Sequence, residues 1–375
     1  MNPRLALGGL RVARILGIPI YIHFSWLIIF GLIAWTLATG YFPENYPDLP
    51  ASSHWAKGLI ASLLFFLSIL LHELGHSVVA LRNGIQIRSI TLFIFGGVAQ
   101  LAKEPEDGGA EFKIAVAGPL VSFALAAIFY LASSFKLVGS FLLPVTTYLA
   151  FINLILALFN LIPAFPLDGG RILRGLLWKR WGKAKATRIA ATGGSLFAYF
   201  LIFSGVLGLL RGAGIAGVWY ILIGWFLKDA SSSAYQMVRF DEALQGMRVR
   251  DVMLQDVKTL PAHISLAEAA REHFLHTGYG GYPVARDQQI VGLLCLRDIQ
   301  RHSADEREST SVQAAMTPLA DPVTVAPDEP LLRAASKMAA GGIGRLLVME
   351  DGRLVGMLTM NLLMRHLRIR EQLAA

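Results

Sequence analysis

The chain has 375 residues, of which 54% are hydrophobic and 16% are charged, and its formal net charge is +8. This composition is more hydrophobic and less charged than that of an ordinary soluble protein, and it fits a membrane protein with a soluble part attached. Much of the positive charge flanks apolar stretches, where Lys and Arg set orientation in a membrane, so we expect a lipid bilayer and no nucleic acid as partner. The single cysteine, Cys295, excludes an intrachain disulfide and a cysteine-rich metal site.

Residues 18–24, ahead of the first apolar stretch, are rich in β-forming residues and predict a strand or interfacial segment. A first membrane span is expected over residues 24–37. His23 lies at the edge of that span, where a lone histidine is more often a hydrogen-bonded structural group than a metal ligand. The following loop, residues 40–54, carries acidic residues but no Lys or Arg, so we place it outside the cytosol.

A second span, residues 59–81, contains the segment His72-Glu73-Leu74-Gly75-His76. On a helix, two histidines four residues apart lie on one face about one turn apart. Two neutral imidazoles at this spacing suit Zn²⁺, and the glutamate beside the first can act as a general base. Ionisable groups at bilayer depth are costly and indicate function, so a chance match in a soluble helix is the weaker interpretation.

Residues 85–101 are rich in β-branched and aromatic residues and are interrupted at Gly96 and Gly97, which predicts a strand or hairpin. Irregular backbone at membrane depth is tolerated only where it lines a cavity or is covered by protein. Beside a metal site, an open strand edge could receive an extended substrate by strand addition. The alternative is an ordinary surface hairpin, and the residues alone favour neither interpretation.

Two further spans are expected over residues 112–131 and 145–161, and the second is followed by a proline-containing turn that leads to Asp168. A zinc site with two histidines needs a third protein ligand if a fourth position is to hold water. Asp168 is the only carboxylate between Glu111 and Asp229, so it is the natural candidate. The alternative is that its side chain only forms a local turn at a helix end.

The segment 171–188 contains seven Lys or Arg residues and no acidic residue, which marks it as cytoplasmic. Spans over residues 190–210 and 218–227 would complete a six-transmembrane-helix core. This arrangement places both termini in the cytosol.

Together, these residues resemble the site-2 protease family of intramembrane zinc metalloproteases. The matching segments are His72-Glu73-Leu74-Gly75-His76, Gly118-Pro119 and Asn160-Leu161-Ile162-Pro163-Ala164-Phe165-Pro166-Leu167-Asp168-Gly169. They agree with the family in order and topology, and the likeness covers most of a peptidase domain that we assign to residues 1–235. The resemblance implies a membrane α-helical metalloprotease core with a membrane-associated hairpin. In this hairpin, the region around Gly96 and Gly97 resembles the strand that lies near the substrate in the family.

The resemblance also implies roles for individual residues. His72, His76 and Asp168 would bind one zinc ion per chain, and Glu73 would activate the water. Asn160 would help to position the scissile peptide or steady the oxyanion, a role that suits an amide donor. The alternative for Asn160 is a hydrogen bond between helices. The expected substrate is a transmembrane protein whose helix unwinds locally, and several family members cleave membrane-tethered regulators.

The second half of the chain contains a repeat with a period of about 64 residues, following a polar linker at 236–246. The repeats, residues 247–305 and 310–370, resemble a tandem pair of α/β CBS domains, known as a Bateman module. Such a pair suggests regulation of activity or assembly, with a homodimer formed through the CBS domains as one means. We expect this module in the cytosol.

CBS pairs commonly bind adenosine nucleotides, and the expected ribose contact is a Ser or Thr three residues before an Asp. The first repeat has Cys295 and Asp298 at these positions, and the second has Thr359 and Leu362. Each repeat therefore keeps half of the pattern. An adenine nucleotide held with Asp298 and Thr359, and a purely structural or dimerising role, are equally compatible with the residues.

The sequence thus predicts a multi-pass protein of a prokaryotic cell membrane that cleaves a peptide bond within or near a transmembrane segment. One alternative is a CBS-regulated transporter or channel, but the spans lack repeat symmetry and their polar residues group into one zinc constellation. A second alternative is a catalytically inactive membrane scaffold. The intact Glu73 argues against it, because a protein that only binds partners has no need of a general base.

Overall fold

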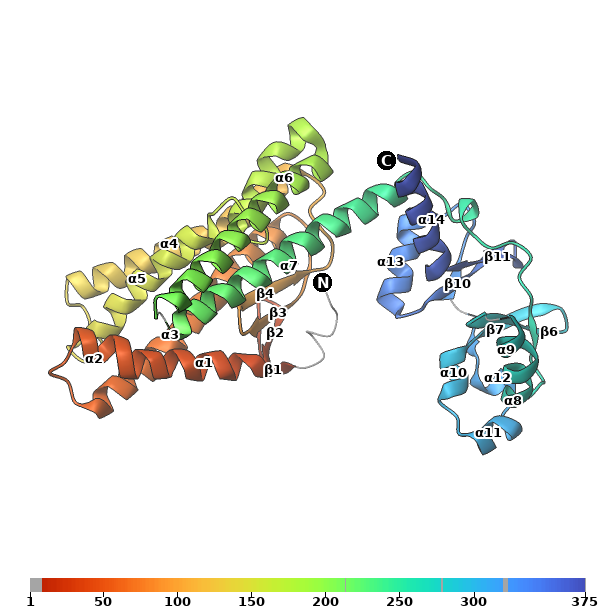
Figure 1. The fold of residues 1–375 in the computed structure, drawn as a ribbon, viewed down its shortest axis with the longest axis horizontal. Coiled ribbons are helices and arrows are strands. Elements are labelled where there is room, and N and C mark those ends of the chain that lie inside the picture. The colour runs from red at the N-terminus through yellow and green to blue at the C-terminus, as the bar shows by residue number, and fades with distance from the viewer. Residues whose placement is uncertain (1–8, 213, 278, 320–322, 375) are drawn as a thin grey trace. The chain divides into compact units, whose positions relative to one another are not determined.

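A computed structural model describes residues 9–374 apart from 213, 278 and 320–322 (Figure 1). The chain divides into two compact units, with the boundary between Val238 and Arg239.

The first unit is mainly helical. Its helices are α1 Phe24–Thr36, α2 Phe42–Asn45, α3 Ala51–Arg82, α4 Gly108–Ser134, α5 Leu143–Asn160, α6 Asp168–Leu210 and α7 Ile215–Leu244, with a π-helical turn η2 Leu37–Tyr41 between α1 and α2. Among the described residues, five helical stretches are long and apolar enough to cross a membrane: 24–45, 51–82, 108–134, 143–160 and 168–210. These five correspond in order to the first five predicted spans. The sixth predicted span lies in α7, which is not one of the five, so the count of six stays a prediction.

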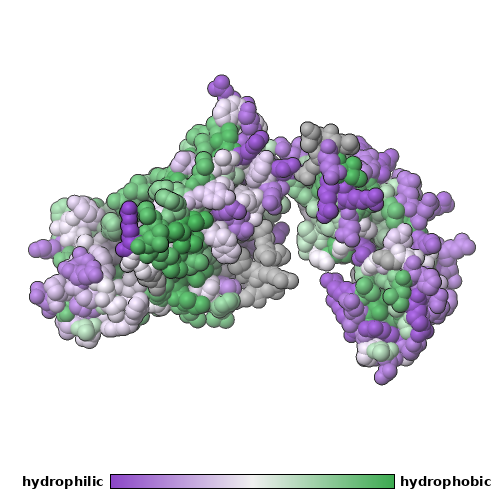
Figure 2. All heavy atoms as spheres, in the orientation of Figure 1, coloured by the Kyte–Doolittle hydropathy of each residue, from purple (hydrophilic) through white to green (hydrophobic). Residues whose placement is uncertain are grey.

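Hydrophobic residues cover the middle of this helical unit as a broad outer surface (Figure 2). Large apolar side chains point outward from several helices, for example Leu120 of α4, which is 59% exposed, and Phe203 of α6, which is 67% exposed. An apolar surface of this extent is what a helix bundle presents to lipid.

Four strands form a sheet in the order β1-β2-β3-β4, and they lie together at one end of the helical unit (Figure 1). Their bounds are β1 Gly9–Ile15, β2 Ile18–His23, β3 Ile87–Phe93 and β4 Gly96–Leu101. β2 forms the short strand predicted ahead of the first span. β3 and β4 are antiparallel and form the predicted hairpin, with Phe93 opposite Gly96. β4 is the last strand in the order, so its outer edge pairs with no other strand of the described chain. The location of the hairpin in the membrane stays a prediction.

The helix α6 contains a break at Gly182, where φ is 77° and ψ is 161°. Only glycine adopts this backbone conformation readily, so residues 168–181 and 183–210 form two separate helical stretches, and the basic segment 171–188 lies across the break. Residues 236–244, most of the segment that we expected to form a polar linker, are helical within α7. Leu244 is 1% exposed and packs in the hydrophobic core of the second unit, which explains why this segment is ordered.

The second unit contains two sheets, in the orders β5-β6-β7-β8 and β11-β10-β9. Its strands are β5 Leu260–Pro261, β6 Gly281–Arg286, β7 Gln289–Cys295, β8 Thr317–Pro318, β9 Thr324–Val325, β10 Arg345–Glu350 and β11 Arg353–Thr359. Its helices are η3 Val249–Asp251, α8 Leu266–Glu268, η4 Ala269–Phe274, α9 Leu275–Thr277, α10 Leu296–Gln300, α11 Ala304–Ser309, α12 Val312–Ala315, α13 Leu331–Gly341 and α14 Met360–Ala374.

The two sheets repeat the same pattern, as the sequence period predicts. In each, a two-residue strand pairs parallel to a strand that then forms an antiparallel hairpin, and the register shifts at equivalent points, after Val284 and after Val348. The segments that lead into the repeats are exchanged. A Cβ on Gly356 would lie 2.8 Å from the sulfur of Met253, and a Cβ on Gly292 would lie 2.8 Å from that of Met316. Each repeat is therefore completed by residues that precede the other.

Candidate active site

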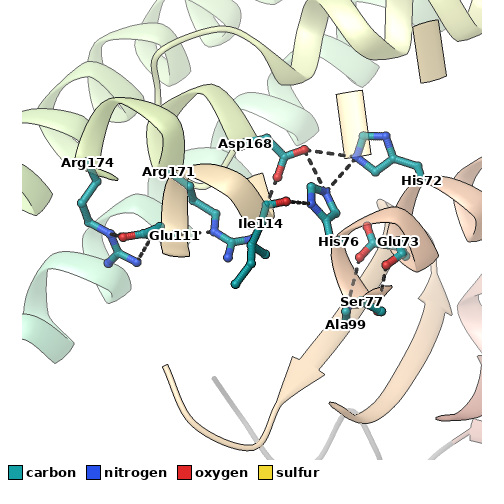
Figure 3. Close-up of polar contacts among 10 residues, drawn as sticks. All are labelled: His72, Glu73, His76, Ser77, Ala99, Glu111, Ile114, Asp168, Arg171 and Arg174. Carbon is teal, nitrogen blue, oxygen red and sulfur yellow. Dashed lines mark hydrogen bonds and ion pairs between the residues drawn. The ribbon is translucent and has the colours of Figure 1, made fainter. Parts of the chain in front are cut away.

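Three polar side chains from distant parts of the first unit converge inside the helix bundle (Figure 3). Asp168 Oδ2 lies 3.1 Å from Nε2 of His72 and 3.1 Å from Nε2 of His76, and the two Nε2 atoms are 3.2 Å apart. All three residues are buried. The structure therefore brings together the three residues that the sequence analysis proposed as metal ligands.

The local fold explains why these side chains meet. His72 and His76 lie one turn apart on α3, and Asp168 is the first residue of α6. The turn that follows α5 packs tightly on the start of α6, because residues 169 and 170 have no side chains. A Cβ on Gly169 would lie 2.2 Å from the Leu161 carbonyl oxygen, and one on Gly170 would lie 2.5 Å from backbone atoms of the turn.

The second nitrogen of each imidazole is fixed by α4. His72 Nδ1 lies 2.9 Å from the hydroxyl oxygen of Ser122, and His76 Nδ1 donates to the carbonyl oxygen of Ile114 at 2.7 Å. Partners of this kind set the tautomer and ring orientation of metal-binding histidines, and they leave both Nε2 atoms free to bind a metal. Neither Ser122 nor Ile114 was predicted from the sequence.

Gly118 of α4 leaves open the space at which the two imidazoles point. A Cβ on this residue would lie 2.2 Å from Nε2 of His76 and 2.6 Å from Nε2 of His72. From the sequence, Gly118-Pro119 was cited only as one of the segments that carry the family resemblance. Residues 114, 118 and 122 follow one another at four-residue spacing, so one face of α4 covers the site, and this periodicity is the signal that could have revealed it.

The residues present fit a zinc ion. Two imidazole nitrogens and one carboxylate oxygen are a common protein ligand set for catalytic Zn²⁺, and ligands bound tetrahedrally at roughly 2.0 Å lie about 3.3 Å from one another. The three donor atoms of His72, His76 and Asp168 are separated by 3.1 to 3.2 Å.

Glu73 faces the sheet, beside the three converging residues (Figure 3). Its Oε2 atom accepts a hydrogen bond of 3.2 Å from the backbone N–H of Ala99 in β4. A Cβ on Gly97 would lie 2.6 Å from Cγ of Glu73, so this close approach requires glycine in the strand. Gly96, with φ of 129°, begins the strand. The carboxylate thus lies between the helix that carries the histidines and the edge strand.

Asn160 and His23 have local partners. Asn160 is the last residue of α5, and its Nδ2 donates to the carbonyl of Leu156, in its own helix, at 3.0 Å. His23 caps the start of α1, where its Nδ1 accepts from the backbone N–H of Ser25.

The candidate nucleotide residues of the second unit cap helices. The Asp298 carboxylate accepts from the backbone N–H of Cys295 at 2.9 Å, and the Thr359 hydroxyl accepts from the backbone N–H of Leu362 at 3.2 Å. A hydroxyl residue three positions before an acidic residue is also the pattern of a capping box. In the first repeat the Cys295 side chain takes the place of the hydroxyl and completes the box with Asp298, whereas the second repeat keeps only the hydroxyl half. Burial raises the pKa of the Cys295 thiol, which agrees with a packed residue rather than a reactive one.

Comparison with known proteins gives matches in both units. Residues 60–142 and 136–203 match the model of Peptidase family M50, and residues 249–305 and 312–369 each match the CBS domain. The Rip3 protein of Mycobacterium tuberculosis is 37% identical over 358 residues, which cover 94% of this chain and 91% of Rip3. Zinc metalloprotease MJ0392 of Methanocaldococcus jannaschii is 31% identical over 363 residues, which cover 97% of each chain. The solved structure of a site-2 protease from M. jannaschii is similar over 60% of this chain and 95% of that one, with 34% identity and a TM-score of 0.45.

Proposed function

This chain belongs to peptidase family M50, the site-2 protease family of zinc metalloproteases, and from that premise we propose that it hydrolyses a peptide bond within or near the transmembrane segment of a membrane-tethered protein. The observation that carries the proposal is the convergence of His72, His76 and Asp168 inside an apolar helix bundle, with the Glu73 carboxylate beside them. A soluble protease would have no reason to bury its site among helices with apolar outer faces.

His72, His76 and Asp168 would hold the zinc ion. When bound, Zn²⁺ supplies a Lewis acid that lowers the pKa of water and polarises a carbonyl group. Ser122 and the carbonyl of Ile114 keep the imidazoles oriented for this task.

Glu73 is the proposed general base. Its carboxylate would take a proton from the attacking water and deliver it to the leaving amine. The hydrogen bond from Ala99 N–H holds this carboxylate beside the sheet edge, so the base and the proposed substrate strand share one location.

The outer edge of β4 is the proposed substrate platform. A transmembrane helix shields its own peptide bonds, so the substrate has to unwind before it can be cleaved, and an extended segment can add to a free strand edge through backbone hydrogen bonds. Gly96 and Gly97 permit a close approach there, and a peptide on this edge would run past Glu73. Asn160 would then donate its amide to the oxyanion, exchanging its bond to Leu156 for one to the substrate.

The two CBS domains are the proposed regulatory part. We propose that the membrane core has six spans and lies in a prokaryotic cell membrane. The CBS domains and both termini would be cytosolic, on the same side as the basic segment 171–188, because Lys and Arg residues accumulate on the cytosolic side of membrane spans. The local capping bonds of Asp298 and Thr359 favour control through assembly, with a homodimer as the form, over control by an adenine nucleotide at these residues.

The first test is the zinc content per chain of the purified wild type and of His76→Ala and Asp168→Ala. We expect one equivalent in the wild type and its loss or sharp weakening in both variants. Zinc retained by Asp168→Ala would show that another residue is the third ligand. A well-folded wild type without zinc would contradict the proposed chemistry.

The second test is a comparison of membrane proteins in cells that express the wild type or Glu73→Gln. The variant should keep the fold and the zinc but lose cleavage by about 10² to 10⁴-fold. Membrane-tethered substrates should therefore accumulate at full length in the variant cells only. Unchanged processing in the Glu73→Gln cells would contradict the role of Glu73 as general base.

A further inference from the structure

Four charged side chains form a cluster behind the candidate metal site, on the side of Asp168 that faces away from the histidines (Figure 3). They are two carboxylates and two guanidinium groups, contributed by α4 and α6: Glu111, Asp168, Arg171 and Arg174. The formal charges of the four balance. A buried, balanced cluster next to a metal ligand is placed to control how that ligand is presented.

The outer part of the cluster joins the two helices. Glu111 is fully buried, and its two carboxylate oxygens accept bonds of 2.8 and 2.9 Å from Nε of Arg174, with a further contact to Nη2. The Arg174 guanidinium lies 4.9 Å from the ring centre of Phe165, in the turn that leads to Asp168. The backbones also touch, since a Cβ on Gly108 would lie 2.4 Å from the carbonyl oxygen of Gly175. The start of α6 is therefore held against the start of α4.

The inner part of the cluster reaches the metal ligand itself. Nη1 of Arg171 lies 4.0 Å from Oδ1 of Asp168, and Nε of Arg171 lies 3.9 Å from Oε1 of Glu111. Both distances are within ion-pair range and too long for direct hydrogen bonds. Arg171 is thus shared between two carboxylates, while the other oxygen of Asp168, Oδ2, is the one that lies 3.1 Å from each histidine.

We propose that Arg171 is a positioning residue that attracts Oδ1 of Asp168, so that this carboxylate presents only Oδ2 to the zinc ion. Glu111 has the second role in this arrangement. The negative charge of Glu111 attracts Arg171 and so limits its approach to Asp168. Without Glu111, Arg171 would form a full ion pair with the Asp168 carboxylate and compete with the metal for that carboxylate. The inference rests on the zinc site proposed above.

The experiment uses the full-length protein in detergent, as the wild type, Arg171→Gln, Arg171→Lys and a matched control, Arg180→Gln. Arg180 is an exposed basic residue of the same helix with no ion-pair partner among the described residues. Three quantities are measured: the zinc dissociation constant by chelator competition, the absorption spectrum of the Co²⁺-substituted protein, and the unfolding temperature of the metal-free protein.

Arg171→Gln should weaken zinc binding on the order of tenfold, as expected when a partner of a metal ligand is removed, and should shift the Co²⁺ bands. Arg171→Lys should recover most of the affinity because it keeps the charge, and Arg180→Gln should match the wild type. The metal-free unfolding temperature should stay the same in Arg171→Gln, since both Arg171 contacts are too long for hydrogen bonds and the Glu111–Arg174 pair remains. A lowered metal-free stability with no rescue by lysine would assign Arg171 a structural role and overturn the inference.

Glu111→Gln is the second variant. It can still accept a hydrogen bond from Arg174 but lacks the charge that restrains Arg171, so zinc binding should again weaken. Zinc affinity and Co²⁺ spectra that match the wild type in both Arg171→Gln and Glu111→Gln would overturn the inference while leaving the zinc site intact. Failure of the proposed function is a separate result, because it requires a wild type without zinc or an Asp168→Ala variant that keeps it.

Discussion

The two candidate ligand sites of this chain differ in whether their polar atoms are hydrogen-bonded to the neighbouring backbone. In the first unit, His76 and Asp168 are 92 positions apart in the chain, and their ligating atoms face each other. In the second unit, Asp298 and Thr359 each bond a backbone N–H group three residues away, at the end of a helix. The first set of atoms faces one shared buried space, and the second set is bonded to the neighbouring backbone.

A ligand site therefore needs polar atoms that are not already bonded to the neighbouring backbone. In the first unit the two Nδ1 atoms are bonded to α4, so both Nε2 atoms and the Asp168 carboxylate present lone pairs to one buried space, and this arrangement indicates that a cation binds there. A helix cap is worth about 1 kcal/mol, which is reason enough for Thr359 or Asp298 to be present without any ligand. Four predictions test this contrast.

Gly118→Ala should abolish zinc binding and proteolysis. The new methyl group would lie within 2.2 Å of Nε2 of His76, in the space at which the donor atoms point. Zinc content per chain measures the effect. Gly31→Ala is the matched control, since it also adds a methyl group to an apolar helix, with no atom within 4 Å of the new Cβ. A Gly118→Ala protein that keeps one zinc per chain would show that the free atoms form no metal site.

Gly97→Val should lower the cleavage rate by about 10²-fold while zinc stays bound, because a side chain there displaces Glu73 from its place beside Ala99. The rate of substrate processing and the zinc content are measured together. Loss of zinc along with activity would show that the edge strand supports the metal site as a whole and not the general base alone.

Ser122→Ala should weaken zinc binding by about tenfold, since His72 loses the partner of its Nδ1 atom. Chelator competition gives the dissociation constant, and Ser134→Ala, at the exposed end of the same helix, is the control. If the two variants bind zinc equally well, the hydroxyl of Ser122 does not orient the imidazole.

Thr359→Val should have the smallest effect. The lost cap should destabilise the second unit by about 1 kcal/mol in denaturant unfolding, without changing the affinity for AMP measured by titration calorimetry. AMP binding that is present in the wild type and lost in Thr359→Val would contradict this contrast between the two sites, because the hydroxyl would then bind a ligand as well as cap the helix.

The sequence was sufficient for the features that depend on local spacing. The pairing of His72 with His76 follows from helix periodicity, the β3–β4 hairpin from β-forming composition interrupted at Gly96 and Gly97, and the 64-residue repeat from matching segments of the chain. Asp168 could be proposed because no other carboxylate lies in that half of the peptidase region. Each of these inferences needed only the order of residues along the chain.

The remaining site residues depend on how helices pack, and a single sequence does not specify that. Ser122 and Gly118 matter only because one particular face of α4 covers α3. Glu111 and Arg174 are 63 positions apart, and each alone resembles an ordinary charged residue near a span. The helix over residues 236–244 was missed for a similar reason, since it is fixed by the packing of Leu244 in the core of the second unit.

The exchanged lead-in segments of the two CBS domains have a consequence for how this half of the chain can change over time. Met253 completes the sheet that contains Gly356, and Met316 completes the sheet that contains Gly292. A gene truncated between the repeats would therefore encode a first domain without β8, with Gly292 uncovered, and a deletion of the first repeat would leave Gly356 uncovered in the same way. Neither repeat is a spare copy of the other, so the pair is gained or lost in evolution as one inherited unit.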